Sequence, residues 1–315
     1  MSFRQEGTED LAVHELECPR NYDLIKSIHA WVYPHIQPVP EITDNRLFRR
    51  VLTVAGVRTP VSISQPSAGM KLEIRCRANV DISKLNRKIT FILGLDVDTS
   101  KALERIKDDD CISYLAEKTD FLRPYTADSP FEGLTKCILQ QQISFRAANV
   151  ITRRLVLEAA SPMKYMHSKY YSFPSCEDIM ELGSSGIKKL GVGYKSDYLL
   201  GLSSMVASGK LDLEEFKQLP HREVVRRLRP IHGIGDWTIK AFAISSLHDF
   251  SVFPLGDLGV RNLLGNLYGT GDAMKTRQVE QLMTRWGPSA PLVLYFLMCA
   301  DVLGLVEQSD RSKKS

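Results

Sequence analysis

The sequence contains few cysteines, and no two of them lie close together. The six are at positions 18, 76, 111, 137, 176 and 299. Zinc and iron–sulfur sites are usually built from closely spaced cysteines, so we expect neither kind of site here. No uncharged apolar run approaches the ~18–20 residues that cross a bilayer, and the first residues lack the basic-then-apolar pattern of a signal peptide. We therefore expect an intracellular protein without membrane contacts.

Glycine-rich nucleotide motifs and a dominant charge sign are also missing. The chain has neither a P-loop nor a Gly-x-Gly-x-x-Gly fingerprint, which disfavours the commonest nucleotide-cofactor folds. Its 41 lysines and arginines against 37 aspartates and glutamates give a net charge of +4. This excess permits a nucleic-acid partner without requiring one. The 315 residues suggest roughly two domains of about 150 residues each.

The first part of the chain is rich in strand patterns. Partly alternating apolar runs, separated by turn-forming glycines and prolines, predict strands at 51–55, 61–64, 71–76 and 90–95. We expect a loose terminus over 1–20, a short helix or strand over 22–33 and a helix over 99–114. Together these segments predict an N-terminal α+β domain, residues 1–118, built on a small antiparallel sheet.

After Pro124 the apolar residues recur at helical spacing. Ser129 followed by Pro130 predicts a helix that starts near Phe131, and Ser175 can cap a helix that runs through Leu182. Further helices are predicted at 195–207, 221–229, 236–247, 257–268, 277–286 and 289–305. The second domain, 119–315, is therefore predicted to be all-α, with a frayed basic tail at 311–315. The predicted fold class is α+β, a sheet domain followed by a helical core.

The most informative segment, 221–242, contains two predicted helices joined by a glycine turn. The first helix ends at Pro230, Gly233-Ile234-Gly235 forms the turn, and the second helix begins at once. The glycines permit positive φ and close backbone approach. The amides after the turn face outward at a helix N-terminus, where the dipole favours an anion. The segment can thus bind phosphates without reading sequence; the alternative is a helix–helix turn without a ligand.

Asp257 is the acid to notice downstream of this hairpin. It follows an apolar run and the turn Pro254-Leu255-Gly256, at the start of a predicted helix. Aspartate is also an ordinary N-cap, which is the alternative interpretation. The combination of hairpin, short loop and capping aspartate is less common by chance than any one of them.

Several segments together resemble the helix-hairpin-helix DNA glycosylase superfamily, and in particular its 3-methyladenine DNA glycosylase II (AlkA-like) branch. In the family's order, they are 131–144, 190–195, the hairpin, 253–261 and Trp286-Gly287-Pro288. The strand-rich N-terminal part resembles the additional sheet domain of that branch. The resemblance implies an all-α helix-hairpin-helix glycosylase core after the sheet.

The resemblance implies an enzyme that flips a damaged nucleotide out of duplex DNA and hydrolyses its N-glycosidic bond. Asp257 matches the catalytic carboxylate, which would stabilise oxocarbenium character at C1′ and orient or deprotonate water. N-alkylated purines can be cationic and are then good leaving groups. Alkylated purines of the 3-methyladenine type are therefore the expected substrates, with hypoxanthine or another lesion as an alternative.

The residues expected to line the base pocket are mostly aromatic. Trp237 and Trp286 match pocket positions of the family, where an aromatic face can stack on an electron-poor base; buried core tryptophans are the alternative. Leu258 and Ala241 occupy positions where the family often has aromatic residues. Tyr125 is a further candidate for the pocket.

The resemblance also implies monofunctional chemistry. Relatives with lyase activity carry a Schiff-base lysine where this chain has Trp237, and tryptophan cannot form an imine. Lys240 lies one helical turn further along. The C-terminal region lacks the four-cysteine cluster of the endonuclease III branch. No cofactor is expected to be required.

The hairpin is expected to carry most of the DNA contacts. Gly233 and Gly235 would bind phosphate through backbone amides, and Lys240 is a further DNA-binding candidate. In the family, main-chain carbonyls of the hairpin also hold a structural monovalent ion, Na⁺ or K⁺. Arg229, Ile231 and Gly233 match those carbonyl positions.

Gln142 stands at the family's DNA-inserting position, where the best-known pattern has leucine. Gln140-Gln141-Gln142 interrupts a helix whose Phe131, Leu134, Ile138 and Phe145 mark an apolar stripe. The flat amide of Gln142 could stack between bases and hydrogen-bond the orphaned partner, with Gln141 as a second DNA-binding residue. A solvated polar turn of helix is the alternative.

The expected partner is double-stranded DNA that contains damaged bases, bound by a monomer. The location would be cytoplasmic in a prokaryote and nuclear in a eukaryote. The main competing class is a non-catalytic helix-hairpin-helix DNA-binding protein, which would need neither Asp257 nor an aromatic pocket.

Overall fold

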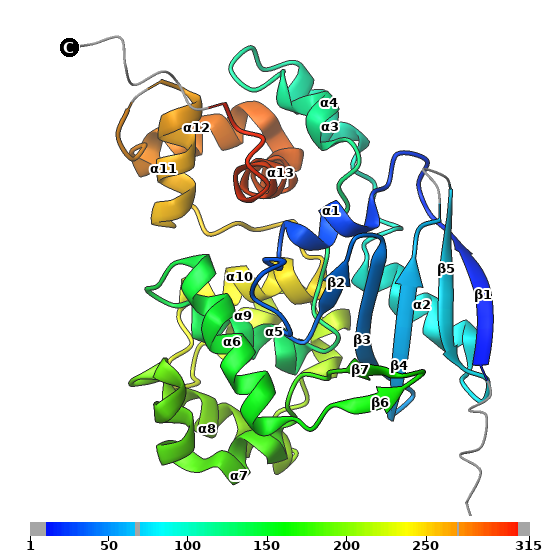
Figure 1. Cartoon of the computed structure of the whole chain (residues 1–315). Helices are drawn as coiled ribbons and strands as arrows, with labels where there is room; N and C mark the ends of the chain where they lie inside the picture. Colours follow the sequence, from blue (N-terminus) through cyan, green and yellow to red (C-terminus); the bar gives the residue numbers. More distant parts are fainter. Residues whose placement is uncertain (1–10, 67–69, 270, 308–315) are drawn as a thin grey trace, which may run out of the picture.

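An antiparallel sheet packs beside a larger helical body (Figure 1). The structure is a computed structural model, and it describes residues 11–66, 70–269 and 271–307. The N-terminal sheet has the strand order β1-β5-β4-β3-β2. Its strands are β1 Leu11–Glu17, β2 Ile42–Asp44, β3 Leu47–Val54, β4 Val57–Ser64 and β5 Lys71–Arg77. The predicted order of a sheet followed by a helical core is confirmed.

The helices of the first half are α1 Leu24–His29, α2 Ile82–Ile92, α3 Ser100–Lys107, α4 Leu115–Thr119, α5 Pro130–Gln140 and α6 Phe145–Ala159. Those of the second half are α7 Cys176–Ile187, α8 Lys195–Ala207, α9 His221–Leu228, α10 Asp236–Leu247, α11 Leu258–Leu267, α12 Thr276–Trp286 and α13 Ala290–Val302. Within the described ranges, none of them combines the length and apolar character needed to cross a membrane.

The sheet is fixed by a tight hairpin and a covering helix. Ala55 and Gly56, between β3 and β4, both have positive φ, 49° and 80°, as a two-residue turn matched to strand twist requires. Phe48 on β3 and Ile63 on β4 are paired and buried. They belong to the same core as Leu85 and other residues of α2, so this helix covers one face of the sheet.

Three predicted strands are confirmed and the fourth is wrong. The runs 51–55, 61–64 and 71–76 lie largely in β3, β4 and β5. The run 90–95 instead includes the end of α2, which Asp81 caps by accepting a hydrogen bond from the Lys84 backbone N–H. The loose terminus predicted over 1–20 is also wrong in part, because 11–17 form β1 and pair with β5. Residues 1–10 lie outside the described residues.

Most helices of the second part begin at the positions that their capping residues predicted. Ser129 accepts from the Glu132 backbone N–H at the start of α5, with Pro130 in the first turn. Ser175 and Asp178 form a reciprocal capping box at α7. Helices α8 and α10 have the predicted bounds. The tail at 311–315 lies outside the described residues.

The helix predicted over 99–114 is too long. Helix α3 ends at Lys107, and the chain then turns at Asp109, which is buried. The carboxylate of Asp109 accepts hydrogen bonds from Trp286 Nε1 (3.1 Å) and from the Tyr268 hydroxyl (2.6 Å), and also pairs with Arg285. This buried acid must reach three partners on the C-terminal helices, so the chain turns here instead of continuing as a helix.

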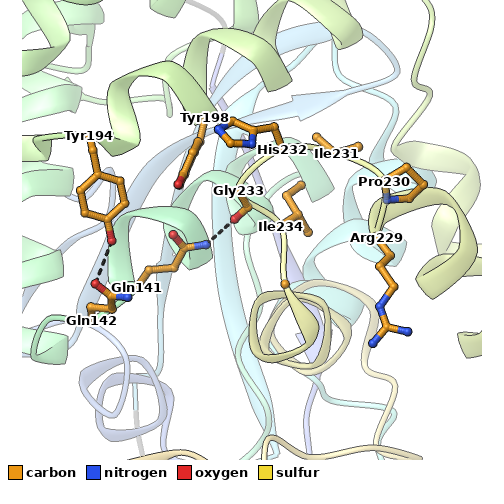
Figure 2. Close-up of a pocket in the computed structure, with 11 residues that line it drawn as sticks. Gln141, Gln142, Tyr194, Tyr198, Arg229, Pro230, Ile231, His232, Gly233 and Ile234 are labelled. Atoms are coloured by element: carbon orange, nitrogen blue, oxygen red, sulfur yellow. Dashed lines mark hydrogen bonds between the residues drawn. The ribbon is translucent and has the colours of Figure 1, made fainter.

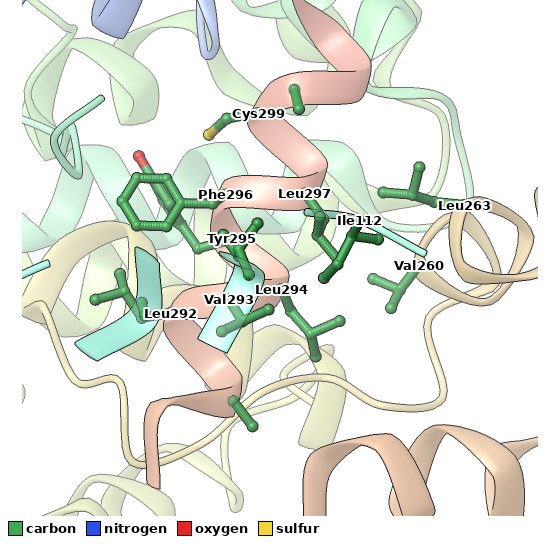
Figure 3. Close-up of a cluster of buried hydrophobic side chains, with 14 of the residues drawn as sticks. Ile112, Val260, Leu263, Leu292, Val293, Leu294, Tyr295, Phe296, Leu297 and Cys299 are labelled. Atoms are coloured by element: carbon green, nitrogen blue, oxygen red, sulfur yellow. The ribbon is translucent and has the colours of Figure 1, made fainter. Parts of the chain in front are cut away.

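The C-terminal core surrounds α13, which is apolar on almost every side (Figure 3). Val293 and Phe296 are fully buried, and Val260 and Leu263 of α11 pack in the same cluster. Helix α3, which precedes the predicted domain boundary at 118, and helix α4, which crosses it, both contact α13. A helix that is hydrophobic all round requires such enclosure.

The second part is not all-α, contrary to the prediction. A short hairpin, β6 Met163–Tyr165 and β7 Ser168–Tyr170, separates α6 from α7. It packs on β3, where the Val51 backbone N–H donates to the Tyr171 carbonyl at 2.7 Å. Strands of three residues are too short to give an alternating pattern. The hairpin ties the helical part to the sheet.

A buried cation joins the sheet to the helical body. The Arg50 guanidinium on β3 is fully buried and pairs with Glu41 at 2.8 Å and with Glu132 of α5 at 2.6 Å. Lys136, one turn further along α5, also pairs with Glu132 at 2.7 Å. Burial by itself raises the pKa of Glu132, but Arg50 and Lys136 lower it to about 2. The carboxylate is therefore ionised, and the network fixes α5 against the sheet.

We expect Arg50→Met to lower the free energy of unfolding by about 3–5 kcal/mol, because two buried carboxylates would then share one lysine. Urea denaturation monitored by circular dichroism measures the change. Lys71→Met is the matched control, since its pair with Glu15 is exposed and such pairs contribute little. Equal midpoints for the two variants would contradict the stabilising role of the network.

Candidate functional site

The predicted hairpin forms between α9 and α10. Helix α9 ends at Leu228, the turn runs over 229–235, and α10 begins at Asp236. Backbone hydrogen bonds from Ile231 N–H to Leu228 O and from Ile234 N–H to Ile231 O, both 3.0 Å, close the turn. The turn residues line an open hollow of about 640 Å³ together with Gln141, Gln142, Tyr194 and Tyr198 (Figure 2).

The two glycines of the turn have different roles. Gly233 has φ +83°, and a Cβ there would lie 2.2 Å from the Tyr198 ring, so glycine is required for both reasons. Gly235 is extended (φ −98°, ψ −179°), which corrects the expectation of positive φ at this position. A Cβ at Gly235 would meet nothing within 4 Å. Glycine there leaves the start of α10 open to a ligand.

The first amides of α10 are suited to bind an anion. The first N–H groups of a helix have no partner within the helix. Gly235 is the N-cap of α10 and supplies no side chain to cap it. The helix dipole and these free donors favour a phosphate oxygen at this end.

Acidic Asp236 lies at the same helix end. Its carboxylate pairs with Lys240 at 2.9 Å and with Arg229 at 3.6 Å. The hydrogen bond from Lys240 holds the pKa of Asp236 below its ordinary value. Both cations that could approach a phosphate at the turn are thus partly neutralised in the free protein.

Asp257 is held by two N–H donors from different elements. It is the N-cap of α11, and its Oδ1 accepts from the Val260 backbone N–H at 3.0 Å. Its Oδ2 accepts from Trp237 Nε1 at 2.6 Å. Trp237 is the second residue of α10, directly after the hairpin turn. The capping interpretation and the functional one are therefore compatible, because the cap uses one carboxylate oxygen and the other is bound by a residue of the hairpin's second helix.

Trp237 is half-buried, and its indole N–H is committed to Asp257. The structure thus gives this residue a positioning contact that the sequence did not predict. Leu258, the next residue after Asp257, is 61% exposed. A large exposed apolar side chain beside the carboxylate is available for contact with a ligand.

Two predicted pocket residues are buried and bonded to other acids, not to Asp257. Trp286 is 1% exposed and donates its indole N–H to Asp109, so it is a core residue and not a pocket wall. Tyr125 is buried, and its hydroxyl donates to Glu41 at 2.7 Å as part of the Arg50 network. Its ring lines a recess of about 70 Å³ between α5, α6 and the sheet domain.

The glutamines end α5 instead of interrupting a longer helix. Gln140 is the last residue of α5, and α6 begins at Phe145, so the apolar stripe predicted through Phe145 belongs to two helices. Gln141 Nε2 donates to the Gly233 carbonyl at 2.7 Å (Figure 2). It also donates to Thr238 Oγ1 at 2.8 Å. Gln141 therefore fastens α5 to the hairpin. Gln142 is exposed and faces the hollow.

The carbonyls predicted to hold a monovalent ion partly serve other bonds. Gly233 O accepts from Gln141, and Ile231 O accepts from the Ile234 backbone N–H. Each oxygen keeps a second lone pair. The turn can still offer oxygens to Na⁺ or K⁺, the hard cations that prefer them.

Sequence reasoning missed the aromatic residues of the hollow and the role of Asp236. Tyr194 is the N-cap of α8, and Tyr198 lies four residues later, so both rings lie on the same face of this helix. The segment 190–195 carried the family resemblance but gave no role to Tyr194. The signal for Asp236 was available as an acid at the first position of the hairpin's second helix.

Comparisons with known proteins agree with the predicted resemblance, which is confirmed. Residues 135–289 match the model of the HhH-GPD superfamily base excision DNA repair proteins. A Bacillus subtilis protein named DNA-3-methyladenine glycosylase is 24% identical over 223 residues, 69% of this chain and 74% of that protein. A solved 3-methyladenine DNA-glycosylase from Archaeoglobus fulgidus has a TM-score of 0.81 and 25% identity, covering 91% of this chain and 98% of that one. A Clostridium acetobutylicum 8-oxoguanine glycosylase/lyase, solved with double-stranded DNA, shares the fold. Its TM-score is 0.71 at 16% identity, and the match covers 94% of this chain and 99% of that one.

We expect Asp236→Asn to tighten binding to undamaged duplex DNA by about threefold to tenfold at low salt. The change removes a negative charge from the phosphate site and frees Lys240 and Arg229 to bind the DNA backbone. The log–log dependence of affinity on salt should also steepen by about 0.9 for each additional phosphate that these cations neutralise.

Fluorescence anisotropy over a salt series measures both effects. Asp81→Asn, which makes the same charge change at the N-cap of α2, is the control. If both variants bind DNA with the same affinity and the same dependence on salt, the charge of Asp236 does not weaken DNA binding at the hairpin.

Proposed function

We propose that this chain, whose residues 135–289 belong to the HhH-GPD superfamily of base excision DNA repair proteins, is a DNA glycosylase. It would hydrolyse the N-glycosidic bond of a base flipped out of the duplex. The observation that carries the proposal is the Asp257 carboxylate, fixed by the Val260 backbone N–H and by the indole of Trp237, the second residue after the hairpin turn.

The fixed carboxylate suits the charge that develops during base loss. As the N-glycosidic bond breaks, positive charge forms at C1′ and the ring oxygen of the sugar, and a preorganised anion stabilises it. Each oxygen of Asp257 accepts one protein hydrogen bond, so lone pairs remain for water. Asp257 can therefore stabilise the sugar cation and orient the attacking water from one position.

A non-catalytic DNA-binding protein is the second candidate, and the same contact argues against it. A module that binds phosphates needs the hairpin and its amides. It does not need an indole N–H, 2.6 Å from a carboxylate, that links the hairpin to the next helix. We therefore attribute this contact to a role of the carboxylate in catalysis.

We infer alkylated purines of the 3-methyladenine type as the substrates. The names of the Bacillus subtilis and Archaeoglobus fulgidus relatives support this class. The half-buried Trp237 ring and the exposed Leu258 offer apolar contacts beside the carboxylate. A cationic base is already a good leaving group, so the site needs no additional acid. Hypoxanthine or another purine lesion is the alternative substrate.

The proposed chemistry is monofunctional hydrolysis without a lyase step. Trp237 stands directly after the hairpin and cannot form an imine. Lys240, one turn on, is held in an ion pair by Asp236 at 2.9 Å. A protonated, paired ammonium is a poor nucleophile. The product would be an abasic site in an uncut strand.

The proposed partner is damaged double-stranded DNA, bound by a monomer, and an intracellular location follows from that substrate. A structural Na⁺ or K⁺ at the carbonyls of Arg229, Ile231 and Gly233 would place a further positive charge near the phosphate. The proposed reaction requires no other cofactor.

We expect Asp257→Asn to reduce single-turnover base excision by at least about a thousandfold, with DNA affinity within about threefold of the wild type. Asparagine keeps the shape and the capping oxygen but loses the charge that stabilises the sugar cation. The measurement uses oligonucleotides that each carry one defined lesion, including an alkylated purine and hypoxanthine.

Gel analysis with and without alkali reports the type of product. Wild-type protein should give strand breaks after alkali treatment and an intact strand without it. Substantial excision by folded Asp257→Asn would refute the catalytic role, and cleavage without alkali would refute the monofunctional one.

A further inference from the structure

Gln142 is held in a backbone conformation that residues other than glycine rarely adopt. Its φ is +58°, in the left-handed region, between the end of α5 and the start of α6. For a residue other than glycine this costs free energy and persists when the surroundings impose it. The side chain has one clear restraint: its Oε1 accepts a hydrogen bond from the Tyr194 hydroxyl at 2.9 Å (Figure 2).

Tyr194 is itself fixed from two sides. The next residue, Lys195, is 4% exposed, and its ammonium donates to the Leu139 carbonyl in the last turn of α5 at 2.7 Å. This contact pins the start of α8 beside the end of α5. On the other side, the Tyr194 ring meets the Tyr198 ring edge to face, with centroids 5.6 Å apart.

The same rings reach the phosphate-binding turn. Tyr198 packs edge to face on His232, with centroids 4.8 Å apart. Gly233 lies so close to Tyr198 that a Cβ would be 2.2 Å from its ring. The hollow thus has a continuous side formed by Gln142, Tyr194, Tyr198 and the turn, and Tyr194 is 51% exposed along it.

The hydrogen bond with Tyr194 decides which part of the Gln142 amide is free. A carboxamide has an oxygen that accepts and an NH₂ group that donates two hydrogen bonds. Here the oxygen is engaged by a protein hydroxyl. The oxygen keeps a second lone pair, but its direction is set by the Tyr194 hydroxyl, whereas the NH₂ group has no hydrogen-bond partner among the described residues. The NH₂ group is therefore the end that Gln142 presents to a ligand in the hollow.

We propose that Tyr194 is a positioning residue that commits Gln142 to the role of hydrogen-bond donor toward the base left without a partner. The inference rests on the proposed function, in which a base leaves the stack and Gln142 approaches the gap. Tyr194 would act through Gln142 and would not touch the reacting atoms.

A donor at this position distinguishes among the bases opposite the gap. On their minor-groove edge thymine and cytosine present only the O2 carbonyl, which accepts a hydrogen bond, whereas guanine places an N2–H₂ donor next to its N3 acceptor, so an approaching NH₂ group meets a donor there. Two donors that face each other leave both unpaired, which is unfavourable. The protein should therefore prefer a pyrimidine opposite the gap, the natural partner of a purine lesion, over guanine.

The test measures binding to duplex DNA with a tetrahydrofuran abasic analogue placed opposite thymine, cytosine or guanine. The wild type should bind the pyrimidine duplexes about threefold to tenfold more tightly than the guanine duplex. Tyr194→Phe keeps the ring but releases the Gln142 oxygen, so the amide can rotate and accept from guanine. The preference should then fall to less than about twofold.

Two further variants make the test specific. Gln142→Ala should lose the preference, and the double variant should lose no more than either single one, because the two residues act through one contact. Tyr114→Phe is the control: it removes a hydroxyl that accepts from the Glu307 backbone N–H, outside the hollow. It should retain the wild-type preference.

The abasic analogue has no glycosidic bond, so this result does not depend on catalysis. Loss of the preference in Tyr194→Phe supports the inference even if the wild type excises no lesion, an outcome that would refute only the proposed function. A Tyr194→Phe variant with the wild-type preference, or a wild type without one, overturns the inference. Excision by the same preparation would then leave the proposed function intact.

Discussion

The architecture depends on one buried cation that must be neutralised by both halves of the chain. Arg50 has no access to water and takes carboxylate partners from the sheet domain, Glu41, and from the helical body, Glu132. A charge in this setting is tolerable when it is paired and fully hydrogen-bonded. The pairing fixes the N-terminal end of α5 against β3. The position of the C-terminal end of α5, and of the residues that contact it, depends on this pairing.

The far end of α5 is where the candidate site is assembled. Gln141 fastens it to Gly233 and Thr238 of the hairpin, and Lys195 fastens it to the start of α8. The hairpin then places Trp237, whose indole N–H holds Asp257. A series of short polar contacts thus links a salt-bridge network at the domain interface to a carboxylate at the end of another helix. The proposed phosphate site and the proposed catalytic carboxylate are positioned by the same elements, as an enzyme that must hold DNA while it reacts would require.

The sequence predicted this arrangement where local chemistry determines it. Capping at Ser129, Ser175 and Asp257 set helix starts, and the glycine turn marked the hairpin, because these signals act within a few residues. The family resemblance supplied the role of Asp257, because an aspartate at a helix start is by itself more simply explained as an ordinary N-cap.

Contacts between distant segments could not be predicted in this way. Trp286 matched a pocket position, yet its N–H satisfies Asp109, 177 residues earlier in the chain. The β6–β7 hairpin meets β3 through the main-chain bond between Val51 and Tyr171, and it meets β5 through the Tyr165 hydroxyl, which donates to the Cys76 carbonyl. Its three-residue strands leave no alternating pattern in the sequence. Tyr194 acquires its contact with Gln142 through the fold, 52 residues away. Such partners are set by tertiary packing, and the local periodicity of a single sequence does not reveal which distant residues will meet.

The proposed function requires that the hairpin amides bind the DNA backbone while Asp257 faces the flipped nucleotide, and a crystal structure of the protein with duplex DNA that contains an abasic analogue tests this most directly. We expect a phosphate oxygen on the first amides of α10 and the C1′ position of the abasic residue ~3–3.5 Å from the Asp257 carboxylate. A complex in which the phosphates avoid the hairpin, or in which the abasic sugar lies remote from Asp257, would contradict it.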